Sequence, residues 1–432
     1  MASFLSATRL ISIWERLRGS FWFLPSLMAA GAVLLSVGAV QMDAAMEADA
    51  YGRFEFLYLF GPEGARAILS AVATSMITVA GLTFSITMLT LQLASSQFGP
   101  RLLRNFMRDR GNQVVLGTFI STFVYCLLVL RTVKGVEGAS FVPHLAVAIG
   151  VVLAVAGLAV LIYFIHHTAT SIRIETLLAS LADETAATID RLFPEKIGHE
   201  EVRHDVDPPD FSAGLTIRPR SSGYVQSVDS DALLHLATEE NLVVSVSARP
   251  GTFVTERDPL LRVVASKAPA EEKVDALRAT LIVGTERTPD QDLDFSIRRI
   301  VEIAQRALSP GINDPTTALY CIDRLREALM RLAGRDMPSS RRYDKGGHLR
   351  IVAVAVSFET LAVAAFGAVA HYAGTDTDVL EGLASALDKV IEEAGILGLS
   401  KLRALRLSIR ERIRSGASTL EVPGHGRKTS DQ

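Results

Sequence analysis

Residues 68–93 read ILSAVATSMITVAGLTFSITMLTLQL, and this stretch decides the fold class. It contains no Asp, Glu, Lys or Arg, and it is longer than the roughly 20 predominantly apolar residues with which a helix crosses a bilayer. Three further stretches of this kind lie around it. The sequence therefore predicts a transmembrane domain over residues 1–167, with spans at residues 21–40, 68–93, 114–130 and 145–165.

The character of the chain changes after the fourth span. Hydrophobic residues make up 49% and charged residues 21% of the 432 residues, but the long apolar runs end near residue 167. The net charge of -3 gives no indication of a nucleic-acid partner. The two cysteines, Cys126 and Cys321, are too few to indicate a disulfide framework or a thiolate metal site.

Basic residues predict the orientation, because short cytoplasmic segments of membrane proteins are enriched in Lys and Arg. Arginines precede the first span and follow the second, at Arg9, Arg16, Arg18, Arg101, Arg104, Arg108 and Arg110. The first loop is mainly acidic, with Asp43, Glu47, Asp49, Glu55 and Glu63. This distribution predicts that the N-terminus and the C-terminal domain are both cytoplasmic.

The second span carries two unlike faces. Steps of four and three residues select small or polar side chains, apart from Met88: Thr74, Thr78, Gly81, Ser85 and Gln92. The line shifted by one position is almost wholly apolar: Ser75, Val79, Leu82, Ile86, Leu89 and Leu93. Each line occupies one side of an α-helix. We expect the first line, called the polar seam below, to meet protein or water and the second to meet lipid.

Two interpretations of the polar seam stay open. Small residues let membrane helices approach closely, so the seam is typical of helix packing. Alternatively, several copies of the helix surround an axis, and the seam lines a pathway for ions. After the break at Gly99-Pro100, the arginines 101, 104 and 108 predict a short basic helix at the interface, near lipid headgroups.

The second half predicts a cytoplasmic α+β domain. Its expected parts are a helix and linker at 168–209, a β-rich module at 210–284, a helical region at 285–415 and a disordered tail at 416–432. Within the module, Asp229 should cap a helix that runs to Glu239. The helical region should include helices at 376–394 and 400–415. The β-rich module is loosely similar to the small β-sandwich of lipoyl and biotinyl carrier domains. It has no lysine at a hairpin tip, so we expect no attached cofactor.

The stretch Ile351–Ala370 is long enough for a fifth span, but Glu359 lies in its middle. An acidic residue at the centre of a membrane helix costs about 2.5–3.5 kcal/mol. The β-branched residues at its start favour a different interpretation. We predict a buried strand over Ile351–Val356, followed by a soluble helix that begins near Ser357.

A tight corner is predicted in the helical region. Thr288 should cap a helix that starts with Pro289 and runs to Leu308, with Gln291 three residues later completing the cap. Asp314 should cap the next helix, which ends near Leu332. Four residues near this corner are candidates for binding a ligand or partner: Asp292, Arg298, Asn313 and Asp314. Capping and ion pairing account for the same residues, and no metal site is predicted.

Two sequence blocks resemble a known family. They are FSIT through SSQFGPR at residues 84–101, and RTPDQD through ALSPGINDPTTA at residues 287–318. Both look like the bacterial predicted membrane proteins of domain-of-unknown-function family 2254. The resemblance implies a bacterial inner-membrane protein with several N-terminal spans. It brings no established activity and no assigned functional residues.

Function is therefore predicted from the seam. The first hypothesis is a homo-oligomeric ion channel or transport protein lined by the second span, and the alternative is a membrane-anchored sensor or scaffold. The expected partners are the lipid bilayer and further copies of the chain, together with ions or a cytoplasmic partner. No Gly-rich phosphate loop, metal-ligand motif or nucleophile elbow occurs, so we do not expect an enzyme.

Overall fold

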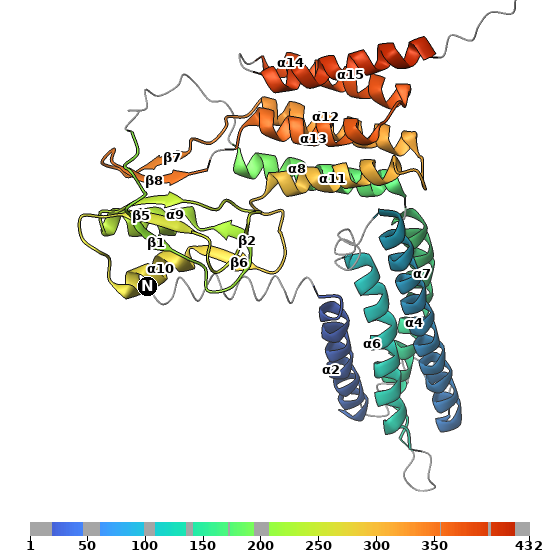
Figure 1. The fold of residues 1–432 in the computed structure, drawn as a ribbon. Coiled ribbons are helices and arrows are strands. Elements are labelled where there is room, and N and C mark those ends of the chain that lie inside the picture. Colours follow the sequence, from blue (N-terminus) through green and yellow to red (C-terminus); the bar gives the residue numbers. More distant parts are fainter. Residues whose placement is uncertain are drawn as a thin grey trace, which may run out of the picture. The chain divides into compact units, whose positions relative to one another are not determined.

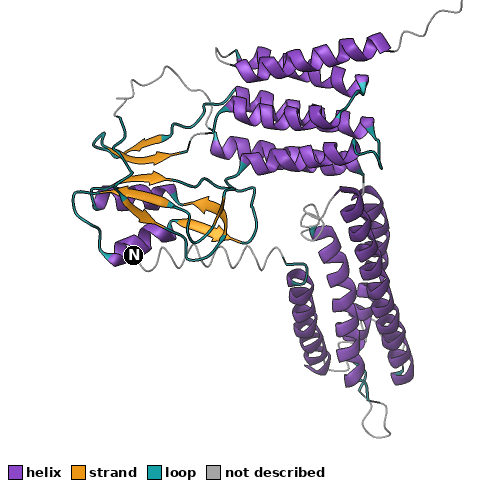
Figure 2. Cartoon of the chain, in the orientation of Figure 1, coloured by secondary structure: helices purple, strands orange, loops and turns teal. Residues whose placement is uncertain are grey.

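The computed structural model describes residues 20–45, 61–98, 109–134, 141–171, 173–193, 207–354, 356–395 and 399–419. The chain forms two compact units, Met1–Thr176 and Leu177–Gln432, which we call the membrane unit and the second unit. The described part of the membrane unit is almost entirely helical, whereas the second unit combines helices with strands (Figures 1 and 2). Each unit is considered by itself.

Four helices of the membrane unit are long and apolar enough to cross a membrane. They coincide with the four predicted spans, and each is longer than its prediction, α4 by the most, with 37 residues. Their bounds are α2 (Phe23–Ala45), α4 (Pro62–Phe98), α6 (Arg110–Thr132) and α7 (His144–Ser171).

Small residues bring these four helices together. A Cβ atom added at Gly150 of α7 would lie 3.2 Å from Leu69 of α4, and one at Gly157 would lie 3.1 Å from the sulfur of Met76. Close contact through small side chains is the usual basis of helix association in lipid, where no hydrophobic effect holds helices together. The buried side chains of the bundle include Tyr125 of α6, whose hydroxyl donates a 2.9 Å hydrogen bond to the carbonyl of Ala146.

The helices of the second unit lie in stacked pairs (Figure 1). The α14–α15 contact lies within one layer, and contacts of α12 with α14 and with α11, together with the α11–α13 contact, join the layers. Ion pairs fasten α8, because Glu184 lies 2.7 Å from Arg299 and Asp190 lies 2.6 Å from Arg335. The helix bounds are α8 (Ile174–Leu192), α9 (Ser230–Glu239), α10 (Glu271–Ala279), α11 (Leu293–Ala307), α12 (Pro315–Ala333), α13 (Phe358–Tyr372), α14 (Thr377–Ala394) and α15 (Ser400–Thr419).

The strands form two sheets. The larger has the order β1-β5-β3-β8-β7, in which only the β3–β8 pair is parallel, and the smaller is the antiparallel sheet β4-β2-β6. Buried side chains of both sheets share one core with α9 and α10, which contribute Leu233 and Leu277. The strand bounds are β1 (Leu215–Ile217), β2 (Gly223–Val228), β3 (Val243–Val246), β4 (Phe253–Val254), β5 (Leu261–Val264), β6 (Leu281–Gly284), β7 (Arg341–Tyr343) and β8 (Leu349–Ala353).

The larger sheet corrects the predicted end of the β-rich module at residue 284. Strands β7 and β8 come from inside the region predicted to be helical, and Val244 of β3 pairs with Ile351 of β8. The mixed sheet also differs from the small β-sandwich to which the module was likened. The stretch 351–370 does form a strand followed by a helix, and Ser357 caps α13 by accepting the backbone N–H of Thr360.

The predicted start of α11 at Thr288 is wrong. The helix begins at Leu293, and its N-cap is Asp292, whose carboxylate accepts the backbone N–H of Phe295. Gln291, predicted to complete the cap of Thr288, instead exchanges hydrogen bonds with the backbone N–H and carbonyl of Val228 in β2. Gln291 is therefore engaged in a tertiary contact and does not complete the predicted cap.

Other predicted boundaries shift less. Helix α9 follows its predicted cap Asp229, and α12 follows Asp314. Helix α15 continues to Thr419, past the predicted start of the tail at residue 416. Residues 420–432, like 194–206 of the predicted linker, lie outside the described part of the chain.

Candidate functional site: the exposed face of helix α4

Helix α4 has one buried line. Leu69, Ala73, Met76, Ala80 and Thr83 recur at steps of four and three residues, and all five are buried. This spacing places them on one side of the helix, which faces α6 and α7. Two of the five are alanines, so the backbones can approach closely there.

The polar seam lies outside this buried line. Its five residues, Thr74, Thr78, Gly81, Ser85 and Gln92, are all exposed in the single chain. A Cβ atom added at Gly81 would find no other heavy atom within 4 Å. The described residues of the other three spans therefore leave the seam uncovered, so packing against those spans does not account for it.

Two hydroxyl groups of the seam, those of Thr78 and Ser85, are satisfied locally. Thr78 donates a 2.7 Å hydrogen bond to the carbonyl of Thr74, and Ser85 donates a 2.9 Å bond to the carbonyl of Gly81. Such bonds to the preceding turn remove most of the cost of a hydroxyl in lipid. The seam is thus tolerated by a bilayer and presents a narrow, small-residue surface to any neighbour.

Neighbouring helices expose a different kind of surface. Leu34 of α2 is 75% exposed, and Val152 and Ile162 of α7 are 66% and 63% exposed. Bulky apolar side chains of this kind suit lipid. The apolar line of α4 resembles them, since Leu82 and Leu89 are also exposed. The seam therefore differs both from the other spans and from the other exposed side of its own helix.

The predicted interfacial arginines, Arg101, Arg104 and Arg108, lie outside the described residues. The other end of α4 is described. Glu63 is exposed in its first turn, and Arg66 donates a 2.9 Å hydrogen bond to the carbonyl of Val133 at the end of α6.

The predicted ligand or partner corner is not one site. Asp292 caps the start of α11 and Arg298 lies in its second turn, whereas Asn313 and Asp314 follow its other end. A helix of 15 residues is about 22 Å long, so the two pairs lie far apart. Asp314 caps α12, and Asn313 adopts a left-handed backbone conformation with φ of 48°.

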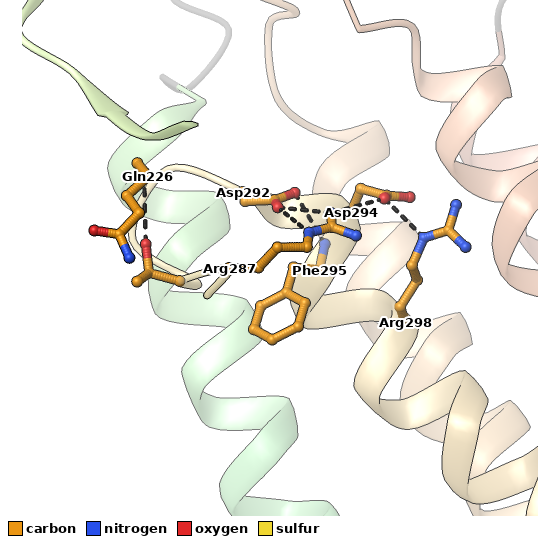
Figure 3. A network of polar contacts seen from close by, with 7 residues as sticks. Gln226, Arg287, Asp292, Asp294, Phe295 and Arg298 are labelled. Atoms are coloured by element: carbon orange, nitrogen blue, oxygen red, sulfur yellow. Dashed lines mark hydrogen bonds and ion pairs between the residues drawn. The ribbon is translucent and has the colours of Figure 1, made fainter. Parts of the chain in front are cut away.

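Asp292 and Arg298 belong to a structural ion network instead (Figure 3). Arg287 contacts Asp292 at 2.6 Å and Asp294 at 3.1 Å, and Arg298 contacts Asp294 at 2.8 Å. The guanidinium of Arg287 also lies 5.1 Å from the ring centre of Phe295. These contacts satisfy the charges mutually and fix the start of α11.

Burial and charge act differently on the two carboxylates. Burial raises the pKa of Asp292, and the neighbouring Arg287 only partly offsets this effect. Burial also acts to raise the pKa of Asp294, but the hydrogen bonds from Arg298 and Arg287 outweigh it, so that the pKa falls.

Burial raises the pKa of the Cys321 thiol to about 12, which keeps the thiol protonated and unreactive. Among the described residues, no group of three or more His, Cys, Asp or Glu could hold a metal ion.

Asp43 is a polar residue of the membrane unit whose role the sequence did not suggest. Predicted as part of an acidic loop, it is buried in the last turn of α2. Its carboxylate accepts the backbone N–H groups of Leu145 and Ala146, each at 2.9 Å, and so caps the start of α7. A signal was present, because Ala32, Ser36, Ala39 and Asp43 follow one line at helical spacing.

Four helices long and apolar enough to cross a membrane, followed by a unit that combines helices and strands, are typical of a multi-helix membrane protein. Residues 18–389 match the family model described as "Predicted membrane protein (DUF2254)", so the chain belongs to that family. Two similar proteins carry names that describe them as uncharacterized. One from Mycobacterium bovis and one from Mycobacterium tuberculosis are each 34% identical over 392 residues, covering 88% of this chain and 73% of the relative. No solved structure matches the chain.

Proposed function

We propose that this protein is a homo-oligomeric ion channel or transport protein in which α4 helices of several copies face one another through the polar seam. The observation that carries the proposal is the exposure of Thr74, Thr78, Gly81, Ser85 and Gln92 together on one side of the helix. Small residues favour close helix contact in lipid. Hydroxyl and amide groups around an axis can in turn replace part of the hydration of a passing ion.

The same proposal includes a location. The arginines before α2 and after α4, set against the acidic first loop, favour the N-terminus and the second unit on the cytoplasmic side of a bacterial inner membrane. The alternative function, a sensor or scaffold with a binding corner, loses its motivation because Asp292 and Asp314 lie at opposite ends of α11. We therefore propose a single function.

Ion flux through liposomes that contain the purified full-length protein tests this proposal. We expect flux from the wild type and a several-fold reduction in Ser85→Leu, because a bulky side chain then occupies the seam. The matched control is Ser75→Leu, which makes the same change on the apolar line of the same helix, where Ser75 is also exposed. Flux should be nearly unchanged in this control.

Two results would contradict the proposal. One is the absence of flux from correctly inserted wild-type protein for monovalent and divalent cations and for anions. The other is an equal effect of the two Ser→Leu substitutions, because lipid-facing and seam positions would then be equivalent.

A further inference from the structure

Four residues of the membrane unit meet where α6 begins and α7 ends. They are Asp109, the N-cap of α6, Gly111 in its first turn, and Tyr163 and His167 near the end of α7. One carboxylate oxygen of Asp109 accepts the backbone N–H of Gly111 at 2.8 Å. Its other oxygen accepts a 2.7 Å hydrogen bond from Nε2 of His167. Asp109 therefore holds its own helix and the neighbouring helix at once.

The surroundings fit the imidazole closely. The ring of Tyr163 stacks on that of His167, with 5.3 Å between ring centres and 13° between planes. A Cβ atom added at Gly111 would lie 2.7 Å from Nε2 of His167 and 3.0 Å from the hydroxyl of Tyr163. Only glycine leaves room for the ring at this position, and the stacked tyrosine fixes the direction of the Nε2–H group.

Both side chains of the pair are partly exposed. The side chains of His167 and Asp109 are 24% and 22% exposed. Histidine is the side chain whose charge most readily changes near neutral pH. A protonated imidazole forms a charge-assisted contact with the carboxylate, which is about twice as strong as a neutral hydrogen bond. Loss of the proton leaves a neutral donor and a weaker contact.

We propose that Asp109 and His167 form a pH-sensitive clasp between α6 and α7, closed most firmly when His167 is protonated and loosened as the pH rises. His167 lies seven residues before Ile174, where α8 begins. Loosening the clasp would free the end of α7 that leads into α8. This inference concerns the membrane unit alone and does not depend on the proposed transport function.

The test separates His167 from the other titratable groups that the structure describes nearby. Besides Asp109, these are Arg110 on α6, Tyr163 and His166 on α7, and Arg173 just after α7. Helices α2 and α4 also pack in this bundle. In sequence, α2 has Asp43 as its one titratable residue, at its far end, and α4 has none after Arg66.

The chain supplies a matched control. His166 precedes His167 directly but is exposed, because adjacent residues of a helix point about 100° apart. His166→Gln and His167→Gln therefore make the same chemical change, one beside the clasp and one within it. Asp109→Asn removes the charge while keeping a side chain that still caps a helix, so this variant should fold.

Spin labels report the separation of the two helices in the full-length protein in nanodiscs. Labels are attached at Val114→Cys on α6 and Ala169→Cys on α7, which are exposed positions, whereas the native Cys126 and Cys321 are buried. In the wild type and in His166→Gln, dipolar broadening should decrease as the pH rises from about 5 to 8, the range in which histidines change charge. His167→Gln and Asp109→Asn should each abolish this change.

Thermal unfolding gives a second, independent measurement. The wild type should lose about 2–4 °C in Tm across the same pH range, and Asp109→Asn, His167→Gln and the double variant should all lose the same pH-dependent part. The clasp is overturned if Asp109→Asn retains the wild-type pH dependence of broadening and Tm. It is equally overturned if His166→Gln removes this dependence as completely as His167→Gln does.

Discussion

At the scale of single residues, the second unit depends on a glycine that makes room for a charge. Gly251 has a φ of 89°, a left-handed conformation that residues with a Cβ atom rarely adopt. A Cβ atom added there would overlap the buried carboxylate of Asp292 and approach Arg287 to 2.8 Å. The turn after β3 therefore packs closely against the ion network at the start of α11.

Gly251→Ala should reduce the free energy of unfolding of the second unit by at least about 2 kcal/mol, from backbone strain and from displacement of Asp292. Urea denaturation of the full-length protein in detergent measures the effect. Gly311→Ala is the control, because a Cβ atom there would meet no heavy atom within 4 Å. The control should change the stability by less than about 0.5 kcal/mol. Equal losses in the two variants would show that the network is unimportant.

At this scale, the sequence predicts a residue's role correctly where the side chain caps the helix that directly follows it. Asp229, Asp314 and Ser357 cap the helices that they were predicted to begin. It fails where the partner is distant in sequence, as with Gln291, which binds the backbone of Val228. Asp43 is a further case, since its partner Leu145 is 102 positions away. No local pattern specifies such pairs.

At the scale of elements, α7 shows how the bundle is held together. It is strongly apolar, so hydrophobicity alone does not determine which side faces its neighbours. Gly150 and Gly157 determine which side of α7 faces α4. They lie seven residues apart, face Leu69 and Met76 of α4, and let the two helices approach closely.

Gly157→Leu should therefore destabilise the membrane unit by about 1–3 kcal/mol, the usual cost of adding bulk to a packed interface. Gly38→Leu makes the same change on α2, where a Cβ atom would meet no heavy atom within 4 Å, and should cost little. Thermal unfolding of both variants in the same detergent gives the comparison. A smaller loss for Gly157→Leu than for Gly38→Leu would contradict this account of α4–α7 packing.

Periodicity identified the helices well but not the arrangement of the strands. All four spans and helices α9, α12, α13 and α14 follow from apolar spacing and capping residues. The larger sheet does not, because β3 pairs with β8 more than 100 residues later. Hydrophobic alternation marks a strand but does not name its partner.

At the scale of the whole molecule, the proposed function places the seam between several copies of the chain. Its residues could be predicted from steps of four and three along residues 74–92, including their separation from the apolar line. Which of the two interpretations applies could not, because a sequence does not state which side of a span its own neighbours cover. The buried line through Leu69, Ala73 and Met76 shows that α4 meets its own chain elsewhere.

The central claim, that seams of neighbouring copies face one another, is tested most directly by cysteine cross-linking along α4 in native membranes. Single cysteines replace each residue from Thr74 to Gln92, with the buried native cysteines retained. We predict cross-linked dimers at Thr74, Thr78, Gly81 and Ser85 and little product at Ser75, Leu82 and Leu89. Cross-linking strongest along the apolar line, or without helical periodicity, would contradict the account.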